Sequence, residues 1–169
     1  MGLPRYRPPP PRQKAYVDTI GKALKRASCL LPSEVADTMA PARACAELLR
    51  EGKATEDNLI ILRTQLRVAM GIENSGIVRG FRAEFESAPA AIDAIESRST
   101  AGGAWRQSAL YAPELASIRE AVRWHAFQLQ HVSAGELHAA ATKLIAQTRS
   151  SGGDLRICGS MQSGQEVPA

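Results

Sequence analysis

The stretch that decides the fold is PELASIREAVRWHAFQLQHVSAGEL, residues 113–137. Its large side chains recur every three or four residues, at Leu115, Ile118, Val122, His125, Leu129 and Val132. Residues at this spacing lie on one face of an α-helix, so the pattern predicts a buried helical stripe. Pro113 suits the first turn of that helix, where a missing amide donor costs little. An amphipathic helix packed against a helical core is therefore expected.

A second signal follows within the same stretch. Ser133 and Glu136 have the spacing of a capping box, in which the serine side chain accepts from an amide three residues on and the glutamate accepts from the serine amide. A last helix is expected to start here. Its apolar residues are Leu137, Ala141, Leu144 and Ile145.

Toward the N-terminus, the same rhythm predicts four more helices, over residues 13–28, 33–50, 56–70 and 77–97. The first is expected to have one apolar side, formed by Tyr16, Val17, Ile20, Ala23, Leu24 and Ala27. Thr55 suits the N-cap of the third, and Gly71 is expected to stop it. Pro41 either kinks the second helix or marks the start of its regular part, and Pro89 should bend the fourth.

A long connection is expected over residues 98–111, with Trp105 folded back onto the core. The residues predicted to form the core share an apolar helical face or anchor a link. They are Leu62, Leu66, Phe81, Phe85, Trp105, Leu115, Ile118, Val122, His125, Leu129, Leu137 and Leu144.

Composition agrees with an all-α fold. The chain is 44% hydrophobic but only 5% aromatic, and it is rich in alanine and leucine, the strongest helix formers. We expect a single compact bundle of five to six helices over residues 13–149. A disordered, Pro-rich and basic arm should precede it at residues 1–12, and a flexible Ser/Gly-rich tail should follow at residues 150–169.

The positive charge is concentrated near the N-terminus. Residues 1–26 hold seven Lys or Arg against the single Asp18, a net charge of +6, so the other residues carry −2 of the chain's +4. No apolar run is long enough to cross a membrane or to form a secretory signal. The cysteines, Cys29, Cys45 and Cys158, have no metal-binding spacing and suggest reduced thiols in a cytoplasmic protein.

Several short motifs are spread along the chain. They are ELLREGKAT (residues 47–55), GAW (103–105), ELASIREAV (114–122), WHAFQLQ (124–130), GEL (135–137) and an N-terminal YRPP (6–9). In these motifs the chain resembles a group of small, uncharacterised helical proteins of bacteriophages, prophages and mobile elements of Gram-negative bacteria. Members of that group usually have no proline at the position of Pro41. The resemblance implies a phage or mobile-element gene in a bacterial host cell, and it implies no activity.

No pattern in the chain indicates an enzyme. There is no GxSxG motif, and the glycine pairs lack the Lys-Ser/Thr of a phosphate-binding loop. His125, His131 and His138 are six and seven residues apart, whereas two metal ligands on one helical face need a spacing of three or four. We expect His125 to be a hydrogen-bonded core residue, and we predict neither a metal nor another cofactor.

Two features suggest nucleic-acid binding. The segment LRVAMGIENSGIVRGF, residues 66–81, has close to the spacing of a helix-turn-helix with its turn at Gly71, although Arg67 stands where that motif needs a very small residue. Two amphipathic helices joined by a glycine turn would give the same pattern. The candidate contacts in this region are Arg67, Arg79 and Arg82.

The basic arm is the second feature. Its candidate phosphate contacts are Arg5, Arg7, Arg12 and Lys14. The same segment also fits a proline-rich ligand for an aromatic groove, or a solubilising tail. We expect a non-enzymatic accessory protein that binds a protein partner, as a regulator, an assembly helper or an inhibitor of a host factor. The alternative is a nucleic-acid-binding regulator that uses residues 66–81 or the arm.

Overall fold

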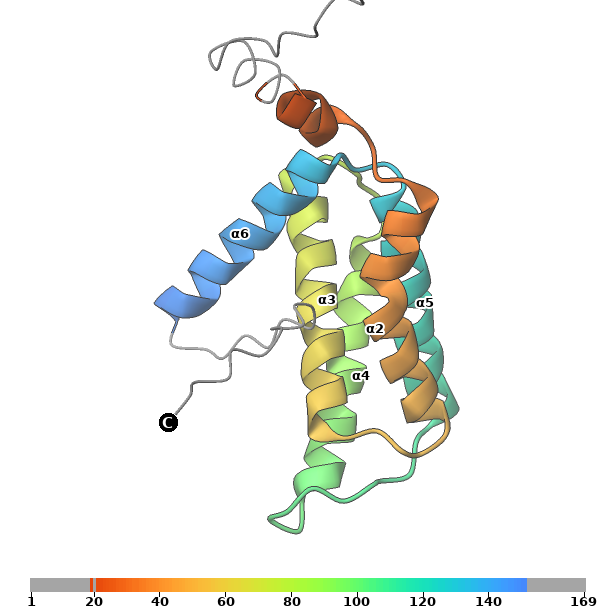
Figure 1. The fold of residues 1–169 in the computed structure, drawn as a ribbon. Coiled ribbons are helices and arrows are strands. Elements are labelled where there is room, and N and C mark those ends of the chain that lie inside the picture. The colour runs from red at the N-terminus through yellow and green to blue at the C-terminus, as the bar shows by residue number, and fades with distance from the viewer. Residues whose placement is uncertain (1–18, 20, 152–169) are drawn as a thin grey trace, which may run out of the picture.

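The computed structural model describes residue 19 and residues 21–151 (Figure 1). After a short helix at residues 21–27, five longer helices follow: α2 (Pro32–Arg50), α3 (Glu56–Ser75), α4 (Arg82–Thr100), α5 (Ala112–Leu129) and α6 (Ala134–Ser150). The described residues contain no β-strand, only an isolated bridge between Cys29 and Ser133. The predicted all-α fold is therefore confirmed. The predicted arm over residues 1–12 and most of the predicted tail lie outside the described residues.

Helices α2 to α5 form a four-helix bundle. Each packs against the next in the chain, and α5 packs back against α2 to close the bundle (Figure 1). Short links favour antiparallel neighbours in such bundles. α6 lies outside this group, where it packs against α3 near its own N-terminal end and then diverges from it (Figure 1).

Most of the predicted core residues are buried between α2, α3, α4 and α5: Leu62, Leu66, Phe85, Ile118, Val122, His125 and Leu129. Phe81, Trp105, Leu115 and Leu137 are half-buried and pack against this core. Leu144 differs, because it lines an open cleft between α3 and α6. α6 packs mainly on α3, and Thr148 is the one residue of α6 that is buried.

The end of α3 differs from the predicted stop at Gly71. α3 runs through Gly71 to Ser75 because its buried face continues with Ile72 and Glu73. A glycine inside a helix costs only about 1 kcal/mol relative to alanine, and the burial of Ile72 offsets that cost. The helix ends at Gly76, whose φ of 77° lies in the left-handed region that glycine adopts without strain.

The start of α4 differs as well, since the helix begins at Arg82 and not at residue 77. The buried carboxylate of Glu73 accepts hydrogen bonds from the amides of Gly80 and Phe81, at 2.9 and 3.4 Å. These two amides precede the first turn of α4, and no carbonyl of the helix can accept a hydrogen bond from them. The carboxylate of Glu73 takes the place of the missing acceptor. The apolar residues before Arg82 therefore belong to a fixed link rather than to the helix.

α2 is one continuous helix with Pro41 inside it, so the alternative in which its regular part begins at Pro41 is wrong. α4 likewise continues through Pro89. α5 ends at Leu129, and Val132, the last member of the predicted stripe, is buried in the turn that follows. Ser133 then caps α6 through its side-chain oxygen, as the capping-box spacing predicts.

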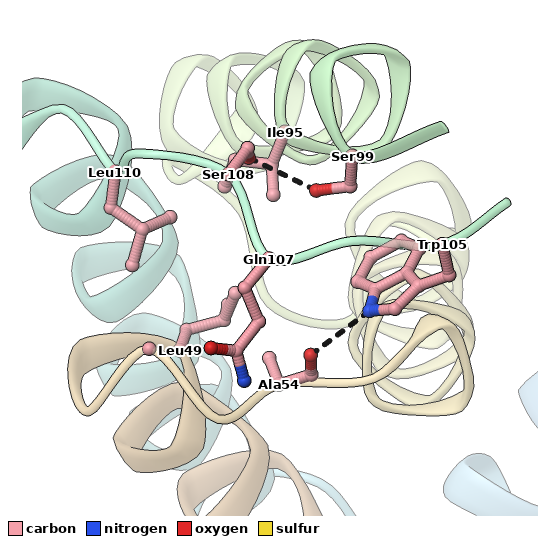
Figure 2. Close-up of a pocket in the computed structure, with 9 residues that line it drawn as sticks. Leu49, Ala54, Ile95, Ser99, Trp105, Gln107, Ser108 and Leu110 are labelled. Atoms are coloured by element: carbon pink, nitrogen blue, oxygen red, sulfur yellow. Dashed lines mark hydrogen bonds between the residues drawn. The ribbon is translucent and has the colours of Figure 1, made fainter. Parts of the chain in front are cut away.

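Trp105 anchors the link between α4 and α5 (Figure 2). This link is shorter than predicted, because α4 continues to Thr100. The indole Nε1 of Trp105 donates to the carbonyl oxygen of Ala54 at 3.2 Å, and the ring packs against the core. The hydroxyl of Ser108 lies 3.0 Å from that of Ser99. These contacts fill the end of the bundle at which α2 and α4 end. We interpret the small hollow that remains beside Trp105 as a packing defect and not as a ligand-binding site.

The short helix at residues 21–27 has no buried face. All its side chains are exposed, with Leu24 at 67%, so Ala23, Leu24 and Ala27 of the predicted apolar side are not buried among the described residues. Its other predicted members, Tyr16, Val17 and Ile20, lie outside the described residues.

The segment after this helix is nevertheless held in place. The amide of Ala134 donates to the carbonyl of Ser28, and the amide of Leu30 donates to the carbonyl of Val132. Gly135 allows the close approach, since a Cβ there would lie 2.9 Å from the carbonyl oxygen of Arg26.

Candidate binding surface

Four aromatic side chains gather where α4 begins and α5 ends. They are Phe81, Phe85, Trp124 and Phe127, which include all three phenylalanines of a chain that is only 5% aromatic. Phe81 and Trp124 stack, with ring centres 4.6 Å apart and planes inclined by 23°. Phe127 stands edge-on to both rings, at 5.7 and 5.9 Å. We call Phe81, Trp124 and Phe127 the aromatic surface.

The aromatic surface is supported from inside and open outside. Phe85, which is only 1% exposed, contacts Phe81 edge-on with ring centres 6.3 Å apart. Phe127 is 41% exposed, and Phe81 and Trp124 are half-buried. Rings held by such contacts lose little conformational freedom on binding, and aromatic residues are enriched in protein interfaces for this reason.

Polar groups surround the rings. The guanidinium of Arg123 lies 4.7 Å from the centre of the Trp124 ring and also donates to Glu120. The ring of His131 lies 4.5 Å from that of Phe127. Among the described residues, none accepts a hydrogen bond from the indole Nε1 of Trp124, a residue that is half-buried as a whole. The aromatic surface therefore offers an unused donor to a ligand.

Carboxylates border the aromatic surface along the seam between α4 and α5. The two helices run antiparallel, with the hydroxyls of Ser87 and Ser117 2.8 Å apart further along the seam. Glu84 and Glu120 lie between this contact and the stacked rings, so they occupy one level on opposite sides of the seam. Glu84 forms no ion pair in the part of the chain that the structure describes. The surface is thus aromatic with a border of both charges, since Arg123 lies over the Trp124 ring and pairs with Glu120.

The geometry of α3 and α4 is not that of a helix-turn-helix. Arg63 near the start of α3 contacts Asp93 in α4 at 2.6 Å, and Asn74 near its end contacts Arg82 at 2.7 Å. Contacts along the whole length require nearly antiparallel axes, whereas the helices of the DNA-binding motif cross at about 90–120°. The helix-turn-helix predicted over residues 66–81 is therefore wrong.

The three basic residues predicted near this hairpin lie within the described part of the chain. Arg67 is exposed between two hollows, of about 240 Å³ beside α6 and about 420 Å³ beside α4. Arg82, at the start of α4, donates to the side chain of Asn74 in α3 and also forms an ion pair with Glu86. Asn74 lies two helical turns after Arg67 in α3. The guanidinium of Arg79 lies over the backbone at Gly76. Asn74 lines the same hollow beside α6 as Arg67, so Arg82 reaches toward the side of α3 on which Arg67 lies.

The other predicted phosphate contacts, Arg5, Arg7, Arg12 and Lys14, lie outside the described residues. A basic group that the sequence prediction did not single out lies next to them in the chain. Lys22, Lys25 and Arg26 are exposed on the short helix, and no ion pair involves them within residues 21–151. Lys25 and Arg26 follow Lys22 by three and four residues, and this helical spacing is the signal in the sequence that could have identified the group.

His125 is a core residue with a defined hydrogen bond. Its Nδ1 lies 3.1 Å from Oε1 of Gln128, whose Nε2 donates to the carbonyl of Ala69 in α3 at 3.2 Å. Since that carbonyl only accepts, Gln128 must offer its oxygen to His125, and Nδ1 carries the proton. Complete burial lowers the pKa of His125 to about 4, against a smaller opposing effect of the Gln128 hydrogen bond. His125 is therefore neutral at pH 7.

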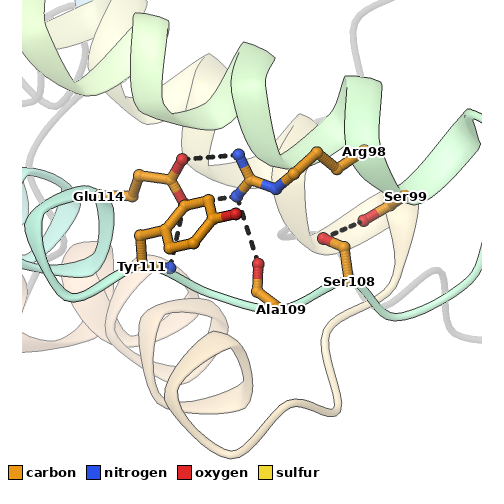
Figure 3. A network of polar contacts seen from close by, with 6 residues as sticks. All are labelled: Arg98, Ser99, Ser108, Ala109, Tyr111 and Glu114. Atoms are coloured by element: carbon orange, nitrogen blue, oxygen red, sulfur yellow. Dashed lines mark hydrogen bonds and ion pairs between the residues drawn. The ribbon is translucent and has the colours of Figure 1, made fainter.

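A second polar network joins α4 to the start of α5 (Figure 3). The guanidinium of Arg98 binds both carboxylate oxygens of Glu114, donates to the carbonyl of Ala109 and stacks over the ring of Tyr111. The hydrogen bond from Arg98 lowers the pKa of Glu114. Every partner in this network belongs to the chain itself, so we assign it a structural role.

Three further findings bear on function. No group of three or more His, Cys, Asp or Glu in the described residues is placed to hold a metal ion. None of the described helices is both long and apolar enough to cross a membrane. No protein-family model, curated protein or solved structure was found to match this chain.

Proposed function

We propose that this chain is a non-enzymatic accessory protein of a phage or mobile element, which binds a protein partner through the aromatic surface. It would act in the cytoplasm of a bacterial host cell as a regulator, an assembly helper or an inhibitor of a host factor. The single observation that carries the binding mode is the rigid, partly exposed cluster of Phe81, Trp124 and Phe127. The short motifs that resemble phage and mobile-element proteins support the context.

The chemistry of the surface favours a protein ligand. Tryptophan and arginine are the residues most enriched among those that dominate binding energy in protein interfaces, and here Arg123 lies over the ring of Trp124. An apolar centre with a charged border is the usual anatomy of such an interface.

The test compares three forms of the full chain: the wild type, Phe127→Glu and Tyr111→Glu. Tyr111 is a matched control, since it is an exposed aromatic residue at the opposite end of α5. Proteins retained from host lysate are quantified for each form, and any specific partner is purified and titrated directly. We expect Phe127→Glu to lose a partner that the other two forms retain. Equal binding by all three folded proteins would rule out the aromatic surface.

A second candidate function, nucleic-acid binding by the basic arm, is favoured by one observation. The exposed Lys22, Lys25 and Arg26 extend the positive charge of the arm onto the described part of the chain. Binding to random duplex DNA should then be strongest at about 50 mM salt, and deletion of residues 1–12 should lower its salt dependence by about three charges. Arg79→Glu, in the link between α3 and α4, should leave the affinity unchanged. Absence of binding at low salt excludes this candidate.

A further inference from the structure

Helices α3 and α6 enclose a cleft on the side of the molecule where α6 lies. α6 begins beside the end of α3 and runs back along it, and the two helices diverge with distance from that shared end (Figure 1). The cleft between them has a volume of about 240 Å³. Pockets for drug-sized ligands measure roughly 300–1,000 Å³, so this cleft suits a smaller ligand.

The lining of the cleft is largely apolar. Ala140 and Leu144 line it from α6, and Ile77 lines it from the link that follows α3. All three residues are half-buried, and Ile77 and Ala140 also pack against the core. Gly71 leaves the α3 wall without a side chain, and a Cβ added there would meet no atom within 4 Å. The cleft therefore has room for an apolar chain between the two helices.

Each wall of the cleft also contributes one cation. Arg67 on α3 and Lys143 on α6 line the cleft and are exposed, and neither has an ion pair or a side-chain hydrogen bond within residues 21–151. Arg67 precedes the last residue of α3 by 75 − 67 = 8 positions, and Lys143 follows the first residue of α6 by 143 − 134 = 9. At a rise of about 1.5 Å per residue, both lie about 12–14 Å from the shared end of the helices. The two cations therefore stand at the same level of the cleft.

Among the described residues, the one carboxylate that lines the cleft already has partners. Glu136 accepts hydrogen bonds from the amide and the hydroxyl of Ser133, both at 2.8 Å. These bonds lower the pKa of Glu136 and hold its charge in the first turn of α6, two turns before Lys143. The side-chain amides of Asn74 and Gln147 line the cleft as well and can donate to a ligand. A ligand that complements this lining carries a negative charge and an apolar chain.

We propose that the cleft between α3 and α6 binds a small amphiphilic anion. Its apolar chain lies against Gly71 and Leu144, and its anionic head group lies between Arg67 and Lys143. The cleft closes at the shared end of the helices and is smaller than a two-chain lipid requires, so the ligand is a free molecule and not part of a membrane. The cleft shares no residue with the aromatic surface, so this site is additional to the proposed function.

The test titrates the ¹⁵N-labelled full chain with octanoate, a carboxylate with one short apolar chain. A ligand of about ten non-hydrogen atoms should bind with a Kd of about 0.1–1 mM and shift the amide signal of Gly71. Acetate lacks the apolar chain and octylammonium has the opposite charge, so neither should shift this signal at the same concentration. The indole signal of Trp124, assigned with Trp124→Phe, should not move. An unmoved Gly71 signal, an equal response to all three probes, or an equal shift of the indole signal overturns the inference.

Two pairs of variants locate the site. Lys143→Gln should weaken octanoate binding about fivefold, whereas Arg149→Gln, an exposed cation of the same helix that does not line the cleft, should leave it unchanged. Gly71→Leu should fill the cleft and weaken binding at least tenfold. Gly102→Leu is its control, because a Cβ there also meets no atom within 4 Å and the residue lies in the link after α4. Wild-type affinity in Lys143→Gln, or in a Gly71→Leu protein whose circular dichroism shows it folded, overturns the inference.

Two competitors separate a free anion from other sources of negative charge. Vesicles of phosphatidylglycerol and a peptide of six glutamates should leave octanoate bound. Displacement by the vesicles assigns the cleft to a membrane lipid, and displacement by the peptide assigns the cations to an acidic protein segment; either result overturns the inference. Phe127→Glu should bind octanoate as the wild type does, so this site and the proposed function stand or fail separately.

Discussion

Acidification should destabilise this protein through His125. Folding buries the imidazole completely and lowers its pKa from 6.5 to about 4, because the charged form loses its solvation. The unfolded chain therefore takes up a proton below pH 6.5 that the folded chain does not accept until about pH 4. The unfolded state binds more protons in this window, so the free energy of unfolding must fall as the pH is lowered.

The size of the effect follows from the two pKa values. Between pH 7 and pH 5, protonation at this one site should lower the free energy of unfolding by about 2 kcal/mol, and the loss should level off near 3 kcal/mol around pH 4. That is a large share of the stability of a domain of this size. The unpartnered Nε2 of His125 offers no compensating hydrogen bond within the core.

Chemical denaturation at pH 7 and pH 5 measures this loss for the wild type, His125→Asn and His131→Asn. Asparagine at position 125 keeps a donor for Gln128 but cannot take up a proton, so this variant should lose about 2 kcal/mol less on acidification. His131 is exposed, and His131→Asn should behave as the wild type. If all three proteins lose the same free energy, His125 does not titrate as a buried neutral group and our account of the core is refuted.

Other substitutions test the packing directly. Leu129→Ala, at a fully buried position, should cost roughly 2–5 kcal/mol in denaturation, and an unchanged melting temperature would mean that the stripe does not pack as described. Ser133→Ala should cost about 1 kcal/mol through the lost cap, measured in the same way. Gly135→Val should speed amide exchange in the segment that precedes α2, since the added side chain collides with it; unchanged exchange would contradict the close approach. Glu114→Gln should lower the melting temperature at pH 7, and its difference from the wild type should shrink as the pH falls below the ordinary Glu value of 4.5, because the pairing with Arg98 lowers the pKa of Glu114.

The helices could be predicted wherever one physical signal dominated. The stripe from Leu115 to Leu129 and the cap at Ser133 are local patterns, and both lead to the observed α5 and α6. Gly71 and Gly76 show the limit of such patterns. Either glycine could stop a helix, and the choice depends on whether Ile72 finds a buried environment, which only the packing of α3 against its neighbours decides.

The aromatic surface could not be predicted from patterns among residues that are close together in the sequence. Phe81 follows α3 by six residues and Trp124 lies in α5, so their stacking depends on how α4 and α5 align. Phe81 was expected in the core because it continues a helical rhythm, yet it lies in a link and is half-exposed. The sequence offered one signal for this surface, which is its small number of aromatic residues. In a chain with so few aromatic rings, each ring is worth assigning to the core or to a binding surface.

The pairing of residues 28–30 with residues 132–134 has a consequence for synthesis on the ribosome. About a hundred residues separate the two partners, so closing this contact costs more chain entropy than forming the α3–α4 or α4–α5 hairpin, and it should form last. At 5–20 residues per second, the basic short helix emerges about 5–20 s before residues 132–134, which bind the segment that follows it. During that interval the nascent chain presents its most positively charged portion with no helix α6 beside it, and any partner that recognises this portion can meet it before the bundle closes.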